Sequence, residues 1–310
     1  MKSKYILENI PAELEKDHVV REYLDRLSSE KSKITMSSFI RRILSFFLSE
    51  NKKFKWDDLN DALVSRFVTS QIKVASPATV NTMLICIKGI SERLWISNRI
   101  DSKTWQLITK IKRVHGSRIS RGRMLGTDEI KHLFEYCDRP RAGLRDVRDA
   151  AIFAVMCYCG LRRSEVAGLR YENVSLDENT PFIRLIGKGN KERVVPLPSE
   201  AVKRMKAWKE QRGNAAGFFF QAIENGEKIC QHGLNPASIY MICKFTALRL
   251  GMKKWTPHDL RRTCASTLIE KGVDLTTVRD WLGHSSVTST QLYDKRSQDR
   301  LSEVAKNFSY

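Results

Sequence analysis

Apolar residues recur at helical spacing over most of the first 100 residues of the chain. In each of four stretches they stand three or four positions apart, so they share one face of a helix. These stretches are residues 19–27, 36–47, 59–68 and 80–94. Ser76 and Pro77 suit the start of the last helix, because serine caps helices and proline fits the first turn. The pattern therefore predicts an N-terminal bundle of four amphipathic helices.

The pattern changes after residue 124, where helix and strand signals alternate. Residues 150–159 are almost entirely apolar, which indicates a buried helix. Residues 182–186 and 193–197 have the composition of strands, and the glycines between them predict a hairpin. Helical spacing returns over residues 200–211, 236–250, 258–271 and 275–282. We expect a mainly α protein whose C-terminal α+β domain holds a small antiparallel β-sheet.

A basic segment separates these two parts. Residues 103–123 contain no Asp or Glu, and their second half is poor in apolar residues, which suits an extended linker. We therefore expect an N-terminal domain at residues 1–111, a linker at 112–123, and a C-terminal domain with a tail at 124–310. The candidate DNA-binding residues are Lys110, Lys112, Arg113, Arg118, Arg121 and Arg123. A solvated basic loop is the alternative interpretation.

The overall charge narrows the class of partner. The chain has 310 residues, a net charge of +19 and a pI of about 9.7. A hydrophobic content of 42% is enough to form a core, which excludes a disordered tail. The basic excess extends over both parts of the chain and favours a nucleic acid as partner, with general solubility as the alternative.

The sequence also indicates a compartment. The longest apolar runs are about half of the roughly 20 residues that a membrane helix needs, and acidic residues follow the basic N-terminus where a signal peptide would be apolar. The seven cysteines are odd in number and lie mostly in apolar segments, which is typical of core residues rather than disulfides. We expect a soluble, cytoplasmic protein with no membrane partner, no metal site and no cofactor.

Three short strings collect side chains that can act on a phosphate. They are GLRRSE at 160–165, HDLRR at 258–262 and LGH at 282–284, followed by a tyrosine, and a lysine stands in the hairpin. Arginine can hold phosphate oxygens, lysine can protonate a leaving oxygen, histidine can move a proton and tyrosine can attack. These cations supply the positive charge that a metal would otherwise provide. The catalytic candidates are Arg162, Lys188, His258, Arg261, His284 and Tyr293.

Each candidate also has a purely structural interpretation, such as a salt bridge, a turn or a helix cap. Their joint occurrence in one order favours a site instead. His258 and Arg261 are three positions apart, so on a helix they share one face. A helix that begins after Pro257 would also direct its positive end toward an anion.

These strings, with IGKGNKERVVPL at 186–197, resemble those of tyrosine recombinases of the phage integrase and Xer type. The resemblance is close over residues 124–297 and looser over the N-terminal helices. It implies that Tyr293 forms a 3′-phosphotyrosyl bond with DNA and that Arg162 and Arg261 clamp the scissile phosphate. It further implies that Lys188 is the general acid, that His258 is a base or phosphate donor, and that His284 hydrogen-bonds the phosphate.

Two more positions follow from the same resemblance. Glu165 matches a position that supports the site structurally, and Arg262 stands where many members have histidine. The resemblance implies a two-domain, C-shaped clamp around double-stranded DNA with a specific core site. It also implies a homo-tetramer on two DNA sites, alone or with a second recombinase, associated with the nucleoid.

The biological role stays open between integration or excision of a mobile element and Xer-like resolution. Two other functions also stay open. One is a catalytically silent DNA-binding or architectural protein of the same fold. The other is a related type IB topoisomerase or telomere resolvase.

Overall fold

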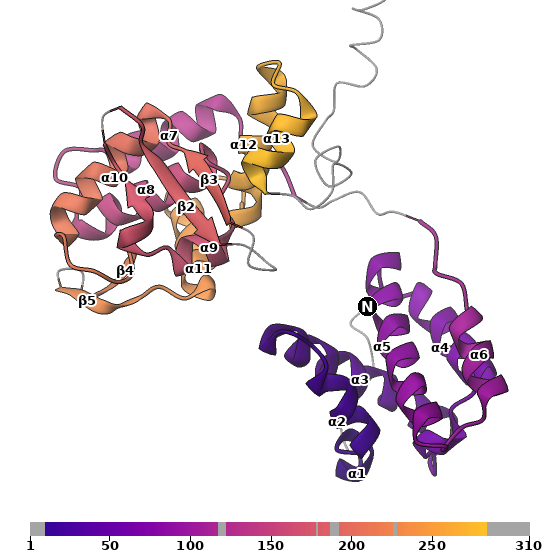
Figure 1. Ribbon diagram of the computed structural model, residues 1–310. Helices are drawn as coiled ribbons and strands as arrows, with labels where there is room; N and C mark the ends of the chain where they lie inside the picture. The colour runs from indigo at the N-terminus through magenta and orange to yellow at the C-terminus, as the bar shows by residue number, and fades with distance from the viewer. Residues whose placement is uncertain (1–9, 117–121, 178, 187–191, 226–227, 284–310) are drawn as a thin grey trace, which may run out of the picture. The chain divides into compact units, whose positions relative to one another are not determined.

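The computed structural model describes residues 10–116, 122–177, 179–186, 192–225 and 228–283 (Figure 1). The chain divides into two compact units, residues 1–120 and 121–310. Each unit has its own hydrophobic core. Within the described residues, no helix is long and apolar enough to cross a membrane.

In the first unit, the described residues form helices and connecting loops. Its elements are α1 (Ala12–Glu15), α2 (His18–Asp25), α3 (Glu30–Glu50), η1 (Trp56–Asp58), α4 (Asp61–Ile72), α5 (Pro77–Ile96) and α6 (Ser102–Lys110). The four predicted helices are confirmed as α2 to α5. The structure adds α6, which occupies the first half of the segment that the sequence presented only as a basic run.

Local chemistry explains where these helices begin and how closely they pack. The Ser76 side chain accepts a hydrogen bond from the backbone N–H of Thr79, and Pro77 follows at the first helical position. The helices α2 and α5 are in contact, and Gly89 of α5 lies against the ring of Tyr23. A Cβ atom at Gly89 would lie 2.3 Å from that ring, so only glycine permits this approach.

The second unit combines helices with two small sheets. Its elements are α7 (Thr127–Cys137), α8 (Leu144–Cys157), α9 (Arg163–Gly168), η2 (Tyr171–Asn173), β1 (Val174–Ser175), β2 (Phe182–Ile186), β3 (Glu192–Pro196), α10 (Ser199–Arg212), β4 (Gln221–Glu224), β5 (Lys228–Gly233), α11 (Pro236–Arg249), α12 (Pro257–Glu270) and α13 (Leu275–Leu282). Every helix and strand predicted for this part is confirmed, with ends that differ by a few residues.

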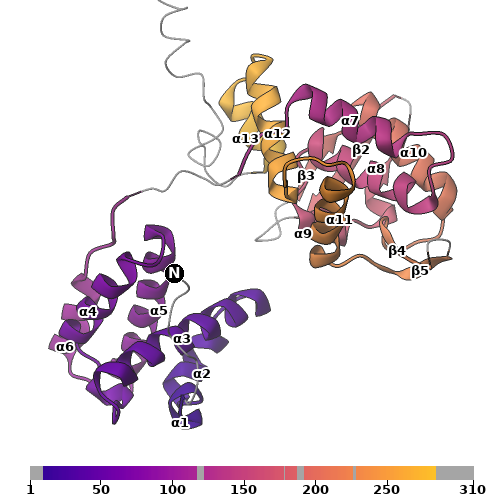
Figure 2. The ribbon, with the colours of Figure 1, turned by 180° about the vertical axis from the view of Figure 1, so that it is seen from behind.

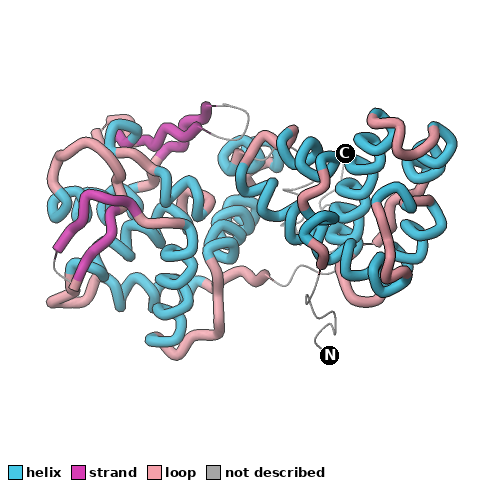
Figure 3. The backbone as a smooth tube through the Cα atoms, turned by 90° about the horizontal axis from the view of Figure 1, so that it is seen from below, coloured by secondary structure: helices cyan, strands magenta, loops and turns pink. Residues whose placement is uncertain are grey.

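The sheets are antiparallel, as predicted for the hairpin of β2 and β3 (Figure 3). The strand β1 adds to β2 to give the order β1-β2-β3. A second sheet, formed by β4 and β5, was not predicted. This β4–β5 hairpin lies at the end of the unit away from α13 (Figures 1 and 2).

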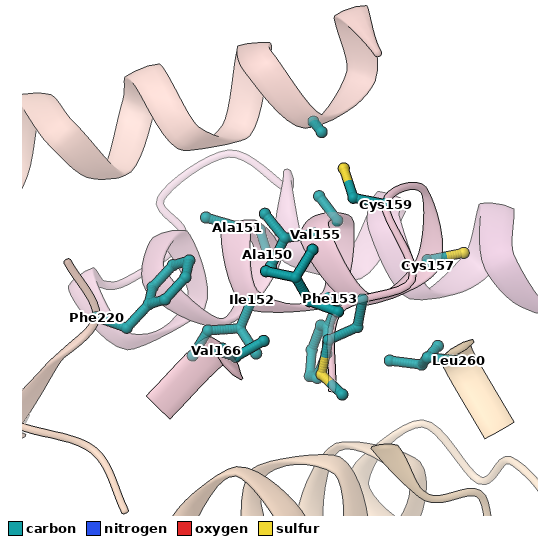
Figure 4. Packing of buried hydrophobic residues seen from close by; sticks show 14 of the residues in the cluster. Ala150, Ala151, Ile152, Phe153, Val155, Cys157, Cys159, Val166, Phe220 and Leu260 are labelled. Atoms are coloured by element: carbon teal, nitrogen blue, oxygen red, sulfur yellow. The ribbon is translucent and has the colours of Figure 1, made fainter. Parts of the chain in front are cut away.

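The helix α8 forms the centre of the second core. Residues 150–157 are all buried, and α8 packs against α10 and α12 (Figure 4). The rings of Phe153 and Trp255 make an edge contact there. Six of the seven cysteines are buried free thiols, which confirms their prediction as core residues; Cys230 is only partly buried. The segment that carries Arg162 directly follows the C-terminal end of this buried helix.

Candidate active site

The structure describes half of the six catalytic candidates. Arg162, His258 and Arg261 are described, whereas Lys188, His284 and Tyr293 lie outside the described residues. In the sequence, Lys188 falls between β2 and β3, and His284 directly follows the last described residue. The geometry of the site is therefore built from the three described candidates and the groups that hold them.

Arg162 stands at the start of α9, as the cap of that short helix. Its backbone N–H and its Nη1 each donate to the carboxylate of Glu165 at 2.7 Å. Its Nη2 donates to the carbonyl oxygen of Gly283 at 2.7 Å. The guanidinium thus links α9 to the residue that ends α13, and the Arg162 side chain remains 40% exposed.

Arg261 reaches the same place from α12, but from inside the protein. The residue is only 3% exposed. Its Nη2 donates to the carbonyl of Leu282 at 2.8 Å, and its Nη1 donates to the carbonyl of Gly160. Arg162 and Arg261 therefore bind the carbonyls of two consecutive residues at the C-terminal end of α13, where the helix dipole favours cations. The structure brings together two arginines that are 99 positions apart in the sequence.

Gly160 makes this convergence possible. It has a φ of +67°, a conformation that L side chains rarely adopt, and it turns the chain from α8 into the segment that carries Arg162. A Cβ atom at Gly160 would lie 2.4 Å from the side chain of Leu282. Glycine is thus required here both for the turn and for the close contact with α13.

The main residue that sequence reasoning missed is Arg193 on β3. Its two terminal nitrogens donate to both oxygens of Glu165, at 3.0 and 2.9 Å. Its guanidinium also packs against Gly283, where a Cβ atom would lie 2.7 Å from Nη1. Arg193 thus connects the sheet, α9 and the end of α13.

A signal for Arg193 was present in the strand alternation. Val195 is fully buried, so Arg193, two residues earlier, faces the same way. A charged residue on the inner face of a strand requires a partner. The sequence did not identify Glu165 as that partner, because the contact joins residues 28 positions apart.

Glu165 is the shared acceptor of this cluster. Burial alone would raise the pKa of its carboxyl, but the hydrogen bonds from Arg193 and Arg162 outweigh it and hold the pKa below its ordinary value. The Glu165 side chain is only 10% exposed. Glu165, which was predicted to support the site, thus accepts hydrogen bonds from Arg162 and Arg193.

His258 lies at the start of α12, one turn before Arg261. The surrounding protein partly desolvates its ring, and the charges of Arg262 and Arg261 repel a proton, so its pKa lies below the ordinary value of 6.5. Arg262, the residue after Arg261, is itself buried. A neutral imidazole at neutral pH can accept a proton or a hydrogen bond.

Asp259 ties the basic linker to this helix. One carboxylate oxygen accepts from the backbone N–H and the hydroxyl of Thr256, which caps α12. The other accepts from the backbone N–H of Arg123 at 2.8 Å. The residue before Arg123, Gly122, has room only for hydrogen, because a Cβ atom would lie 2.8 Å from that carboxylate. The end of the linker is therefore fixed beside His258.

The candidate DNA-contact residues fall into three groups. Lys110, Lys112 and Arg113 are exposed, and Arg118 and Arg121 lie outside the described residues. Arg123 is engaged within its own unit, because it pairs with Glu129 at 2.6 Å and donates to the carbonyl of Lys253 at 2.9 Å. Arg123 thus has a structural role that the sequence did not indicate.

A family model described as the phage integrase family matches residues 123–300. The chain belongs to the phage integrase family. Members of this family are tyrosine recombinases, so the chemistry of this chain is the cleavage and rejoining of DNA strands in site-specific recombination.

Curated relatives agree with this assignment. The tyrosine recombinase XerD of Lacticaseibacillus casei is 28% identical over 300 residues, which cover 92% of this chain and 96% of that protein. The tyrosine recombinase XerA of Pyrococcus furiosus is 29% identical over 182 residues, 59% of this chain and 60% of that protein.

A solved structure supports the fold. The XerH site-specific recombinase, bound to its palindromic difH substrate in a post-cleavage complex, superposes with a TM-score of 0.65. The match has 21% sequence identity and covers 93% of this chain and 88% of that one.

The charges around His258 predict its titration. Because Arg262 repels a proton on the ring, we expect Arg262→Gln to raise the pKa of His258 toward 6.5. The measurement is an NMR titration of the histidine ring protons of the full chain without DNA, assigned with His258→Gln. Arg145→Gln, which removes one charge at the start of α8, is the control and should leave the titration unchanged. A wild-type midpoint at or above 6.5, or no shift in Arg262→Gln, would contradict this account.

Proposed function

We propose that the scissile DNA phosphate binds at the end of α13, against the guanidinium of Arg162 and above the buried guanidinium of Arg261. The observation that carries this proposal is their convergence on the adjacent carbonyls of Leu282 and Gly283. One guanidinium is half-exposed and the other is buried, so Arg162 can contact the DNA while Arg261 sets the field beneath it. Fixed cations of this kind stabilise the charge that develops in phosphoryl transfer.

The remaining steps use the candidates that lie outside the described residues. The Tyr293 oxygen attacks phosphorus and loses its proton to His258, and the bond to the 5′-oxygen breaks. Lys188 gives that oxygen its proton, and His284 donates a hydrogen bond to the phosphate. The products are a 3′-phosphotyrosyl bond and a free 5′-hydroxyl, and attack by a 5′-hydroxyl of the partner strand reverses the step. The covalent bond conserves the phosphodiester energy, so rejoining requires no ATP.

The described contacts support this assignment of roles. His284 follows Gly283, whose carbonyl holds Arg162. Lys188 belongs to the segment between β2 and β3, and β3 carries Arg193, which reaches the carboxylate that also holds Arg162. The segments that carry Arg162, Lys188 and His284 are thus connected through Glu165 and Gly283.

We further propose that the partner is double-stranded DNA with a specific core site. The XerH site-specific recombinase, which has a similar fold, was solved bound to its palindromic difH substrate, and the net charge of +19 suits a polyanion. In this proposal residues 1–111 and 124–310 contact one duplex, the linker at 112–123 follows its backbone, and four copies act on two sites in association with the nucleoid. The DNA that flanks the gene would separate a mobile-element integrase from an Xer-like resolvase.

The nucleophile can be tested with a nicked suicide duplex that carries the inverted-repeat core site from the DNA flanking the gene. We expect wild-type protein to form a covalent adduct on a denaturing gel. Tyr293→Phe should form no adduct, because the phenyl ring lacks the attacking oxygen, and it should bind DNA with an affinity close to that of wild type.

The other outcomes are decisive as well. An adduct with Tyr293→Phe would disprove the nucleophile. Specific binding without any wild-type adduct would favour a silent DNA-binding protein. Efficient relaxation of supercoiled DNA that lacks the core site would favour a topoisomerase.

The linker contacts predict the salt dependence of binding. Each phosphate contact that is lost should reduce the slope of log K against log salt by about 0.9. We therefore expect the double variant Lys112→Gln, Arg113→Gln to lower the slope by about 1.8 on any duplex sequence. The measurement is fluorescence anisotropy between low and high salt. The double variant Lys52→Gln, Lys53→Gln removes the same charge from the exposed segment after α3 and serves as control. Equal slopes for the two double variants would refute a linker that follows the backbone.

A further inference from the structure

Three side chains with metal-binding atoms meet on the β4–β5 hairpin. Glu224 comes from β4, and Cys230 and His232 come from β5. One donor atom from each, a carboxylate oxygen, the thiol sulfur and a ring nitrogen, lies within 4.8 Å of the others. The hairpin lies at the end of its unit away from α13, so this cluster is separate from the candidate active site (Figures 1 and 2).

The strand pairing explains why these three side chains share a face. Glu224 pairs with Lys228 across the hairpin. Cys230 lies two positions after Lys228, and alternate residues of a strand point to the same side. The pairing register shifts between Gln221 and Ile223, opposite His232, and the His232 ring lies at the same cluster. The sequence did not reveal this cluster, because only Cys230 and His232 are close together in the chain. Glu224 joins them only through the pairing of β4 with β5, a hairpin that was not predicted.

The frame beneath the cluster is fixed. The buried guanidinium of Arg148 donates to the carbonyl of Gln221 at 3.2 Å, which holds the base of β4 against α8. At the base of β5, Gly233 lies under the ring of Phe218, where a Cβ atom would come within 2.5 Å of a ring carbon. The three candidate ligands thus stand on anchored strands, while Glu224 and His232 remain exposed to an incoming ion.

The donor set suits zinc better than calcium or magnesium. Thiolate and imidazole are ligands that Zn²⁺ prefers, whereas Ca²⁺ and Mg²⁺ take oxygen. In a tetrahedral zinc site the donor atoms of neighbouring ligands lie about 3.3–3.8 Å apart. Displacements of the donor atoms by about 1 Å, through side-chain rotation, would therefore give the spacing that zinc requires. One thiolate and one carboxylate also balance the charge of a divalent ion.

We propose that Glu224, Cys230 and His232 bind one Zn²⁺ ion, with water in the fourth position. The ion joins β4 to β5 across the hairpin. Binding requires the thiol of Cys230 to lose its proton.

The test uses the untagged full-length chain, freed of metal with a chelator. Zn²⁺ is titrated against a competing dye, and Co²⁺ is added as a spectroscopic probe because thiolate ligation gives it an intense charge-transfer band. We expect one ion per chain, a Co²⁺ thiolate band, and an affinity at least tenfold weaker in Cys230→Ser and in His232→Ala. His132→Ala removes an exposed histidine from α7 and should leave the affinity unchanged.

The opposite results are equally clear. Wild-type affinity in Cys230→Ser, or binding without a thiolate band, would overturn the site. A loss of affinity in His132→Ala equal to that in His232→Ala would have the same consequence. Cys230→Ser and His232→Ala should keep wild-type DNA binding and adduct formation, because neither residue belongs to the recombinase site. This readout also separates a true loss of ligand from misfolding.

Discussion

The carboxylate of Glu165 accepts hydrogen bonds from two guanidinium groups, those of Arg162 and Arg193, and the candidate active site depends on this ion cluster. Each partner belongs to a different segment, so the carboxylate joins the start of α9 to β3. Both arginines also contact Gly283, which leads into His284. Removing one partner would leave the remaining charges partly desolvated and without compensation, which destabilises the site.

The charges around this cluster affect both the stability of the protein and its binding of a phosphate. Within the part of the chain that the structure describes, Arg162 and Arg193 share the single carboxylate of Glu165, and Arg261 donates to two backbone carbonyls. Positive charge is thus gathered at the end of α13. An arrangement of this kind is costly for the protein alone and becomes favourable when an anionic phosphate enters, because the cations are already in place. Burial lowers the pKa of His258, and the positive charges of Arg262 and Arg261 lower it further.

Most of the fold could be predicted from the sequence, because its helices and the β2–β3 hairpin have strong local patterns. The short α6 and the β4–β5 hairpin were missed: α6 lies in a basic segment, and the strands of the hairpin have little apolar alternation. Arg162, His258 and Arg261 stood out through their local strings. The contacts of Arg193 and the trio of Glu224, Cys230 and His232 did not, because each depends on strand register and on long-range pairing.

The central claim is that Glu165 positions the catalytic groups for reaction. It is tested most directly by the single-turnover rate of covalent adduct formation in Glu165→Gln at saturating DNA, with Glu172→Gln, an exposed glutamate of η2, as control. The account predicts a fall of about 100-fold, equivalent to about 2.7 kcal/mol, in Glu165→Gln and no change in Glu172→Gln. A Glu165→Gln rate within twofold of wild type would contradict it.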